Sequence, residues 1–195
     1  ADASTNAAMA SQYSCTFNTQ RVLFKDLVDD LNTTGYTVGA AQGGNRWSRL
    51  NSTLDNRDSI VWKGGNQNDT NYVRATSTLG GAANHLITLE RQVDLTGLTE
   101  AELRFDAFYG INGAAGDYAR VLAISGSNTR VLHTFTGSTS SYTTRLGKDS
   151  GNLNTIVGST VTLRFELYIA GHNGLNAAPA GDKGLFIDNV YVVGK

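Results

Sequence analysis

Polar and apolar residues alternate with a period of two in the second half of the chain. In the segment 101–111, every second residue from position 103 is apolar or aromatic: Leu103, Phe105, Ala107 and Tyr109. The segment 159–171 repeats the pattern with Val161, Leu163, Phe165 and Leu167. A β-strand places successive side chains on opposite faces, so this alternation indicates one buried and one solvated face. Both segments are therefore predicted to be strands.

Shorter apolar runs, each bounded by Gly, Asn or Asp, occur along the rest of the chain. They lie at 21–29, 34–39, 46–50, 59–65, 71–79, 84–95, 117–125, 130–137 and 184–193. Gly, Asn and Asp favour turns, and the Gly-Ser-Asn sequence at 126–128 predicts a hairpin between two of the runs. No long helical periodicity is present. About ten short strands separated by turns predict an all-β fold, a two-sheet antiparallel sandwich.

Composition agrees with a turn-rich β protein. The chain has 195 residues, 40% hydrophobic and 17% charged, with 22 glycines and one proline. This length suffices for one sizeable core and shows no linker, so residues 21–195 are predicted to form one domain. Residues 1–20 are small and polar and are predicted to be an N-terminal arm or an edge strand.

Charge and cysteine content exclude several classes of function. The formal net charge is −1, so no basic excess points to nucleic acid. No run of about 18 apolar residues is present that could span a membrane as a helix. The single cysteine, Cys15, cannot form an internal disulfide.

The sequence contains no recognisable catalytic constellation. His85, His133 and His172 are far apart, and no zinc-protease motif or nucleophile elbow occurs. Glycoside cleavage needs two carboxylates at a set separation. The candidates Glu102, Asp106 and Glu166 are interpreted as solvated residues on polar strand faces.

A polysaccharide-degrading enzyme remains an alternative. It would require a concave sheet face that gathers these residues in one groove: Arg104, Glu166, Tyr168 and His172.

Acidic residues at strand ends raise the possibility of calcium. They are Asp26, Asp29, Asp30, Asp117 and Asp188, the last followed by Asn189 inside an otherwise apolar terminal strand. Calcium takes about six to eight oxygen ligands, and a buried carboxylate without a partner is costly. Either a cation or neighbouring amide donors would remove that cost at Asp188, and both alternatives stay open at this point.

Aromatic and polar residues supply candidates for a carbohydrate ligand. Sugar faces stack on aromatic rings, and polar side chains bind the hydroxyls. Core packing is the competing interpretation for both tryptophans, Trp47 and Trp62. The long polar loop 172–183 adds a histidine at its start. The ligand-binding candidates are Trp47, Tyr109, Asp117, Tyr168 and His172.

The order of these segments resembles a known family. The relevant stretches are "LFKDLVDDLNTTGYT", Trp47, "DSIVW", "NHLITLERQVDL", "AELRFDAFYGINGAAGDYARVLAIS", "VTLRFELYIA" and "GLFIDNVYV". In this order they are similar to the MAM-like, or cleaved-adhesin, domains appended to secreted bacterial peptidases such as the gingipains. The resemblance covers about residues 21–193 and implies a jelly-roll β-sandwich.

The resemblance also implies a function and a metal. It implies a structural Ca²⁺ held by Asp188 and by Asp26, Asp29 or Asp30, with the choice among the three left open. It further implies a secreted or cell-surface bacterial module that associates with a protease or another surface protein.

The expected function is non-catalytic binding or adhesion, with a carbohydrate or surface glycoprotein as the partner. Besides the enzyme, a second alternative is a structural subunit of a surface appendage, with residues 1–20 as its docking arm.

Overall fold

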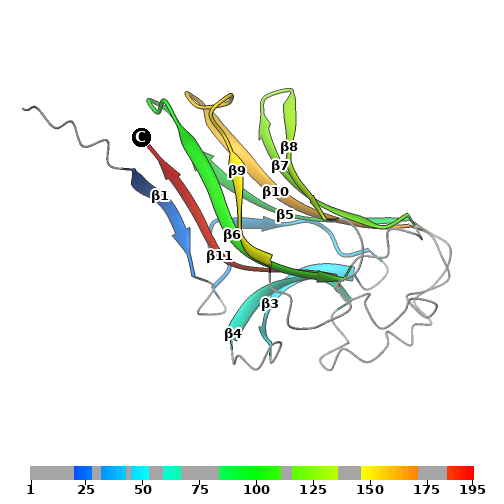
Figure 1. Cartoon of the computed structure of the whole chain (residues 1–195). Coiled ribbons are helices and arrows are strands. Elements are labelled where there is room, and N and C mark those ends of the chain that lie inside the picture. Colours follow the sequence, from blue (N-terminus) through cyan, green and yellow to red (C-terminus); the bar gives the residue numbers. More distant parts are fainter. Residues whose placement is uncertain are drawn as a thin grey trace, which may run out of the picture.

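The computed structural model describes residues 20–27, 32–42, 45–52, 59–66, 84–110, 116–135, 146–170 and 184–195. These residues form eleven β-strands and no helix. The strands build two antiparallel sheets that face one another in a jelly-roll sandwich, as predicted (Figure 1). No helix in this part of the chain is long and apolar enough to cross a membrane.

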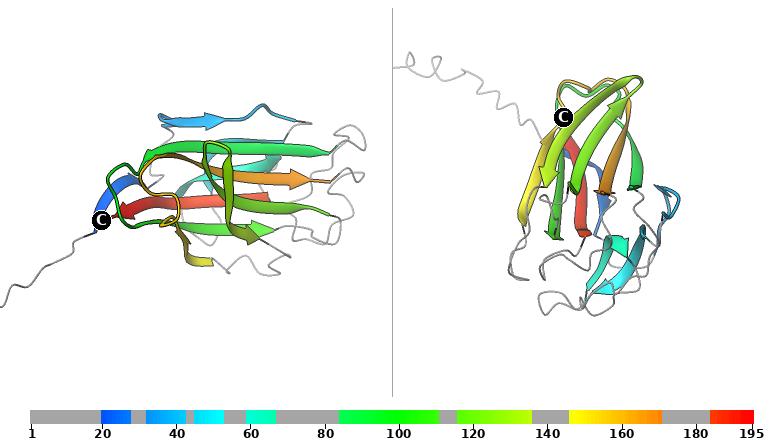
Figure 2. Two further views of the ribbon diagram at one scale, coloured as in Figure 1. Left: turned by 90° about the horizontal axis from the view of Figure 1, so that it is seen from above. Right: turned by 90° about the vertical axis from the view of Figure 1, so that its right-hand side faces the viewer.

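The first sheet has six strands in the order β3-β4-β11-β6-β9, with β1 paired to β11. Their bounds are β1 Arg21–Asp26, β3 Asn45–Ser52, β4 Ser59–Asn66, β6 Ala101–Gly110, β9 Leu146–Asn152 and β11 Gly184–Gly194. The second sheet has five strands in the order β2-β5-β10-β7-β8. Their bounds are β2 Tyr36–Val38, β5 His85–Asp94, β7 Tyr118–Ser125, β8 Asn128–Phe135 and β10 Thr160–Ile169. Two further views show the two layers (Figure 2).

The core lies between the sheets and contains the alternating residues that the sequence singled out. The four alternating apolar residues of β10 and three of those in β6 are at most 2% exposed: Val161, Leu163, Phe165, Leu167, Leu103, Phe105 and Ala107. Rings from both sheets meet there, since the centroids of Phe105 and Phe165 lie 5.4 Å apart in an edge-to-face arrangement. The predicted strand faces are confirmed.

The strand predictions hold in most places. The β7–β8 hairpin turns within the predicted Gly-Ser-Asn sequence, but Asn128 already belongs to β8; Gly126 has a φ of 57° that glycine adopts readily. Strand β9 was not predicted, because its sequence, LGKDSGN, lacks apolar alternation. The predicted run 71–79 and the arm before residue 20 lie outside the described residues.

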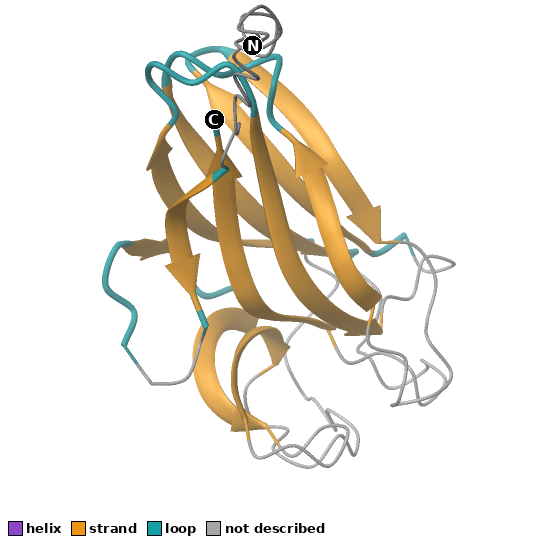
Figure 3. Cartoon of the chain, turned by 60° about the vertical axis from the view of Figure 1, so that its left-hand side comes forward, coloured by secondary structure: helices purple, strands orange, loops and turns teal. Residues whose placement is uncertain are grey.

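The terminal strand β11 has different partners along one of its edges. Residues Leu185–Ile187 pair with β4, whereas residues 190–194 pair with β1. On its other edge β11 pairs with β6, and the register shifts between Asp188 and Tyr191. This irregularity is a β-bulge, in which Asn189 takes a left-handed φ of 50°. Figure 3 shows β1 beside β11 at the edge of the sandwich.

Candidate functional site

The outer face of the five-stranded sheet, meaning the face turned away from the core, carries a pair of stacked tyrosines. Tyr118 on β7 and Tyr168 on β10 are direct cross-strand partners. Their ring centroids lie 4.8 Å apart with an interplanar angle of 14°. The five-stranded sheet bends so that this outer face lies on the inside of the curve (Figure 1). The pair thus stands on the concave side of the sandwich.

Two charged residues occupy the next cross-strand row of the same face. Glu166 on β10 is paired with Arg120 on β7 and with Thr88 on β5. The guanidinium carbon of Arg120 lies 4.0 Å from the centroid of the Tyr118 ring, a cation–π contact. We refer to Tyr118, Arg120, Glu166 and Tyr168 as the tyrosine–arginine cluster.

Glu166 is buried although it lies on the outer face, being only 6% exposed. This corrects the interpretation of Glu166 as a solvated residue: the alternation put it on the outer face correctly, but it is buried there, beside Arg120 across the strand pair and Arg164 on its own strand. Burial raises the pKa of the Glu166 carboxyl, while the charges of Arg120 and Arg164 act in the opposite direction. Arg164 itself is bound to Glu90, with its Nε 2.6 Å from Oε1.

Asp117 lies immediately before β7, at the end of the sheet where the tyrosines stand. It is 7% exposed, and its Oδ1 accepts a hydrogen bond of 2.8 Å from the backbone N–H of Ala170. Because Ala170 follows β10, this bond joins the ends of the two strands that carry the tyrosines. Two of the predicted ligand-binding residues, Asp117 and Tyr168, therefore lie close to one another.

The other ligand-binding candidates do not join this cluster. Trp47 is 2% exposed in the core, where its ring covers Gly64; a Cβ at that glycine would lie 2.8 Å from the indole. Tyr109 packs against the core beside Phe135, with ring centroids 4.9 Å apart. In the structure both rings thus serve packing, the competing interpretation for Trp47. His172 lies outside the described residues.

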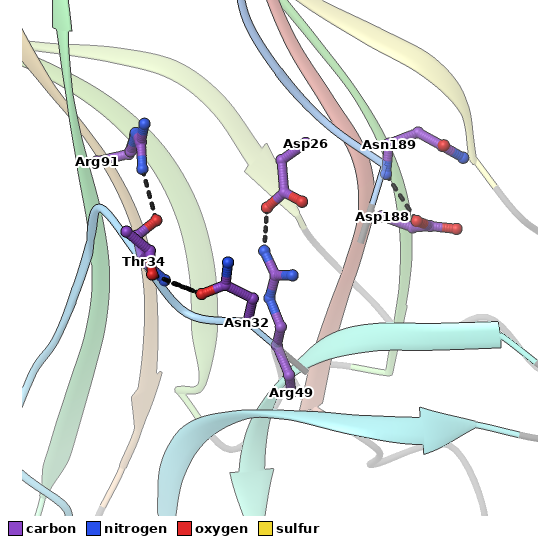
Figure 4. A network of polar contacts seen from close by, with 7 residues as sticks. All are labelled: Asp26, Asn32, Thr34, Arg49, Arg91, Asp188 and Asn189. Carbon is purple, nitrogen blue, oxygen red and sulfur yellow. Dashed lines mark hydrogen bonds and ion pairs between the residues drawn. The ribbon is translucent and has the colours of Figure 1, made fainter. Parts of the chain in front are cut away.

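Asp26 points between the sheets at the end of β1. Its cross-strand partner is the core residue Val190, and its carboxylate forms an ion pair with Arg49 of β3 (Figure 4). The guanidinium of Arg49 also lies 5.0 Å from the ring centroid of Trp62 and 5.7 Å from that of Tyr36. Burial, and next the charge of Asp26, raise the pKa of the Tyr36 hydroxyl.

Asp188 points to the other side of the sheet. Its cross-strand partner is Asp106, a residue of β6 on the outer face, and its Oδ1 accepts a 2.7 Å hydrogen bond from the backbone N–H of Asn189. The side-chain amide of Asn189 donates to Asp106 Oδ2 at 2.8 Å. Figure 4 shows the Asp188 carboxylate directed away from the Asp26–Arg49 pair.

These positions bear on the predicted calcium site. The pairing of β1 with β11 brings the first and last described strands side by side, as that prediction requires. Among the described residues, however, Asp26 and Asp188 do not converge, Arg49 supplies the cation at Asp26, and no group of three His, Cys, Asp or Glu side chains could hold a metal. These residues alone do not fit a calcium ion. Asp29 and Asp30 lie outside the described residues, so their role stays a prediction.

The residues required for the enzyme alternative are divided between the two sheets. Glu166 and Tyr168 lie on the outer face of the five-stranded sheet, whereas Arg104 lies on that of the six-stranded sheet, bound to Glu102 at 2.6 Å. The fourth residue, His172, is not described. A single groove cannot hold both Arg104 and Glu166, since the core separates them.

Sequence reasoning missed Arg120 as a site residue and gave Tyr118 no special weight. The alternation in 117–125 did contain the signal, because Ala119, Val121 and Ala123 are buried and their neighbours must face outward. The pairing of β7 with β10 brings the two tyrosines together, and the sequence of either strand alone does not predict that pairing.

Comparison with known proteins supports the fold. No protein-family model matches the sequence, and no curated protein matches it. Several solved structures are similar at low sequence identity. TmCBM61 in complex with β-1,4-galactotriose gives a TM-score of 0.51 at 11% identity, over 85% of this chain and 92% of that chain. The K1 cleaved adhesin domain of Lys-gingipain from Porphyromonas gingivalis W83 gives a TM-score of 0.50 at 13% identity, over 89% of this chain and 97% of that chain. The chain therefore shares its jelly-roll fold with a carbohydrate-binding module and with the cleaved-adhesin type that its motifs resemble.

Proposed function

We propose that this chain is a non-catalytic carbohydrate-binding module of a secreted or cell-surface protein, and that the glycan lies on the outer face of the five-stranded sheet. The observation that carries the proposal is the tyrosine–arginine cluster. It combines two partly exposed, stacked rings with a guanidinium and a buried carboxylate on one concave face.

The chemistry of the cluster suits a sugar better than other ligands. Aromatic rings bind the apolar faces of sugar rings, while carboxylates and guanidinium groups bind hydroxyls from the side. The Tyr118 ring is fixed by its stacking on the Tyr168 ring. The hydrogen bond between Asp117 and the backbone of Ala170 joins the ends of the two strands that carry these rings. The rings are thus pre-organised, which lowers the entropy cost of binding.

The similar fold of TmCBM61 suggests a first ligand. That protein was solved with β-1,4-galactotriose, so this trisaccharide is the first soluble probe, followed by an array of plant and bacterial glycans. We expect binding in the micromolar to millimolar range, without change in the glycan's chain length, since a binding module releases its ligand intact.

Substitution of Tyr168 tests the location of the site. We expect Tyr168→Ala to weaken glycan binding about tenfold or more, because a stacking surface is lost. The matched control is Tyr191→Ala: Tyr191 stands on the outer face of the six-stranded sheet, with Lys25 Nζ 5.7 Å from its ring centroid. Titration calorimetry on both variants compares the two faces.

Two results would overturn the proposal. One is the absence of any retained glycan on the array. The other is an equal effect of both tyrosine substitutions, which would remove the outer face of the five-stranded sheet as the site.

A further inference from the structure

Three acidic side chains are buried in the described part of the chain: Asp117, Glu166 and Asp188. Two of them accept hydrogen bonds from backbone N–H groups, Asp117 from Ala170 and Asp188 from Asn189. Glu166 differs, because no described residue donates a hydrogen bond to its carboxylate. The oxygens of Glu166 are not fully enclosed, so water or a ligand can reach them. Glu166 therefore has hydrogen-bond acceptor capacity that no described residue uses.

Opposite charges alternate around Glu166. Arg120 lies on one side, across the strand pair, and Arg164 lies two residues away on β10 and is bound to Glu90. These four side chains carry two positive and two negative charges, so the local sum is zero. Arg120 has its guanidinium against the Tyr118 ring, and it interacts with Glu166 through charge rather than through a hydrogen bond.

This arrangement offers no net attraction to a charged ligand. Glu166 attracts the ammonium group of an amino sugar, but Arg120 beside it repels that group; Arg120 attracts the carboxylate of a uronic acid, but Glu166 repels it. In both cases the charged group loses hydration on binding without a net electrostatic gain. Hydroxyl groups lose less hydration, and they donate hydrogen bonds to a carboxylate that accepts none from the described residues.

We infer that the tyrosine–arginine cluster selects uncharged glycans, with Glu166 accepting hydrogen bonds from ligand hydroxyls and Arg120 donating to a neighbouring ligand oxygen. Glu166 is thus a specificity-determining residue. This inference rests on the proposed function, since it assigns a ligand class to the same site.

Binding of this kind depends on pH in a defined direction. Glu166 accepts hydrogen bonds best when ionised, and its burial raises the pKa of its carboxyl. Affinity should therefore decrease as the pH falls through that raised pKa. The other groups that face Glu166 are Arg120, Arg164, Tyr118, Tyr168 and, through Arg164, Glu90.

The test is an array in which each glycan backbone is present in neutral, uronate and amino-sugar forms. We expect the wild-type chain to retain the neutral form of its preferred backbone at least tenfold more tightly than either charged form at pH 7. Titration calorimetry of that neutral glycan between pH 7 and pH 4 should show affinity lost toward acid pH.

Glu166→Gln separates this role from a packing role. The variant keeps the shape of the side chain but has an amide donor in place of one acceptor oxygen, so we expect about tenfold weaker binding and a flat pH profile. The matched control is Glu102→Gln on the outer face of the six-stranded sheet, where the acid is bound to Arg104. That variant should retain both the affinity and the pH profile.

The possible outcomes are distinct. Absence of any glycan binding by the wild type contradicts the proposed function. Preference for a uronate or amino-sugar form, or a Glu166→Gln variant with unchanged affinity and an unchanged pH profile, overturns the inference and leaves carbohydrate binding in place. If Glu166→Gln does not fold, the inference is tested on the wild type alone: it stands if neutral glycans are preferred and affinity falls toward acid pH, and it fails if either result is absent.

Discussion

Two regions of this sandwich place acidic side chains in buried or half-buried positions and use them differently. At the terminal strands β1 and β11, Asp26 is paired with Arg49, while Asp188 accepts a backbone hydrogen bond at a bulge. On the outer face of the five-stranded sheet, Glu166 is as buried as Asp188 but accepts no hydrogen bond from any described residue. In the first region the acids form ion pairs and hydrogen bonds within the fold. In the second region the carboxylate of Glu166 stays available for hydrogen bonds to a ligand.

The regularity of the backbone explains part of the difference. Strand β10 pairs with β5 and β7 without any shift of register, so the sheet needs no polar side chain to complete its hydrogen bonds. Strand β11 changes partner along one edge and bulges against β6 on the other. A bulge leaves backbone groups outside the ladder, and the side chains of Asp188 and Asn189 form hydrogen bonds there. Asp188, the acid in the apolar terminal strand, therefore accepts a backbone hydrogen bond that the irregular strand pairing leaves unmade.

The largest effect is expected from breaking the Asp26–Arg49 pair. Arg49→Leu leaves the carboxylate of Asp26 without its ionic partner, at a position where the side chains are 4% and 14% exposed. Removal of one partner of a buried pair costs about 3–5 kcal/mol of unfolding free energy. Urea denaturation followed by tryptophan fluorescence measures the change.

An exposed ion pair provides the control for that substitution. Arg104→Leu removes a guanidinium that is 39% exposed and bound to Glu102, and surface pairs contribute about 0–1 kcal/mol. If the double variant Asp26→Asn, Arg49→Leu were as unstable as Arg49→Leu alone, the unpaired charge would not be the cause. Equal losses in Arg49→Leu and Arg104→Leu would contradict the assignment directly.

The next effect concerns the bulge residue Asn189. Alanine at this position loses the hydrogen bond to Asp106 and is strained at a φ of 50°, so we expect a loss of about 1–3 kcal/mol. Glycine loses the same hydrogen bond but adopts this φ readily, so its loss should be smaller. Denaturation of the two variants separates backbone strain from the hydrogen bond; a glycine variant less stable than the alanine variant contradicts the role of φ.

A smaller effect of opposite sign is expected at Glu166. A carboxyl whose pKa is raised by folding makes the folded state less stable when it is ionised, and this penalty fades as the pH falls through the raised pKa. Glu166→Gln should thus raise the thermal midpoint of the ligand-free protein slightly at pH 7, and the gain should vanish toward pH 4. A lowered midpoint at pH 7 would show that the fold does use this carboxylate, as it uses Asp188.

The sequence predicted the fold well because alternation is local. Each of β6 and β10 shows its buried face in its own residues, and the pairing of the first and last strands came from the resemblance of motif order. The site was harder to predict, because Glu166 looks like any other polar outer-face residue until β5 and β7 are placed beside it. The burial of Trp47 likewise depends on Gly64, a residue in a different strand.

Calcium is expected to change stability least. Arg49 already neutralises Asp26 in the described structure, so a metal at the terminal strands would have to be held by Asp188 together with Asp29 or Asp30. A ligand that binds only the folded state raises the midpoint of thermal unfolding. Melting curves with millimolar Ca²⁺ and with a chelator should agree within about 1 °C if side chains and backbone alone satisfy these acids, since ΔΔG is then near zero. A larger rise in Ca²⁺ that disappears in Asp188→Asn would instead establish the calcium site, and would mean that the bulge at β11 is held from both sides, by its own amides and by an ion.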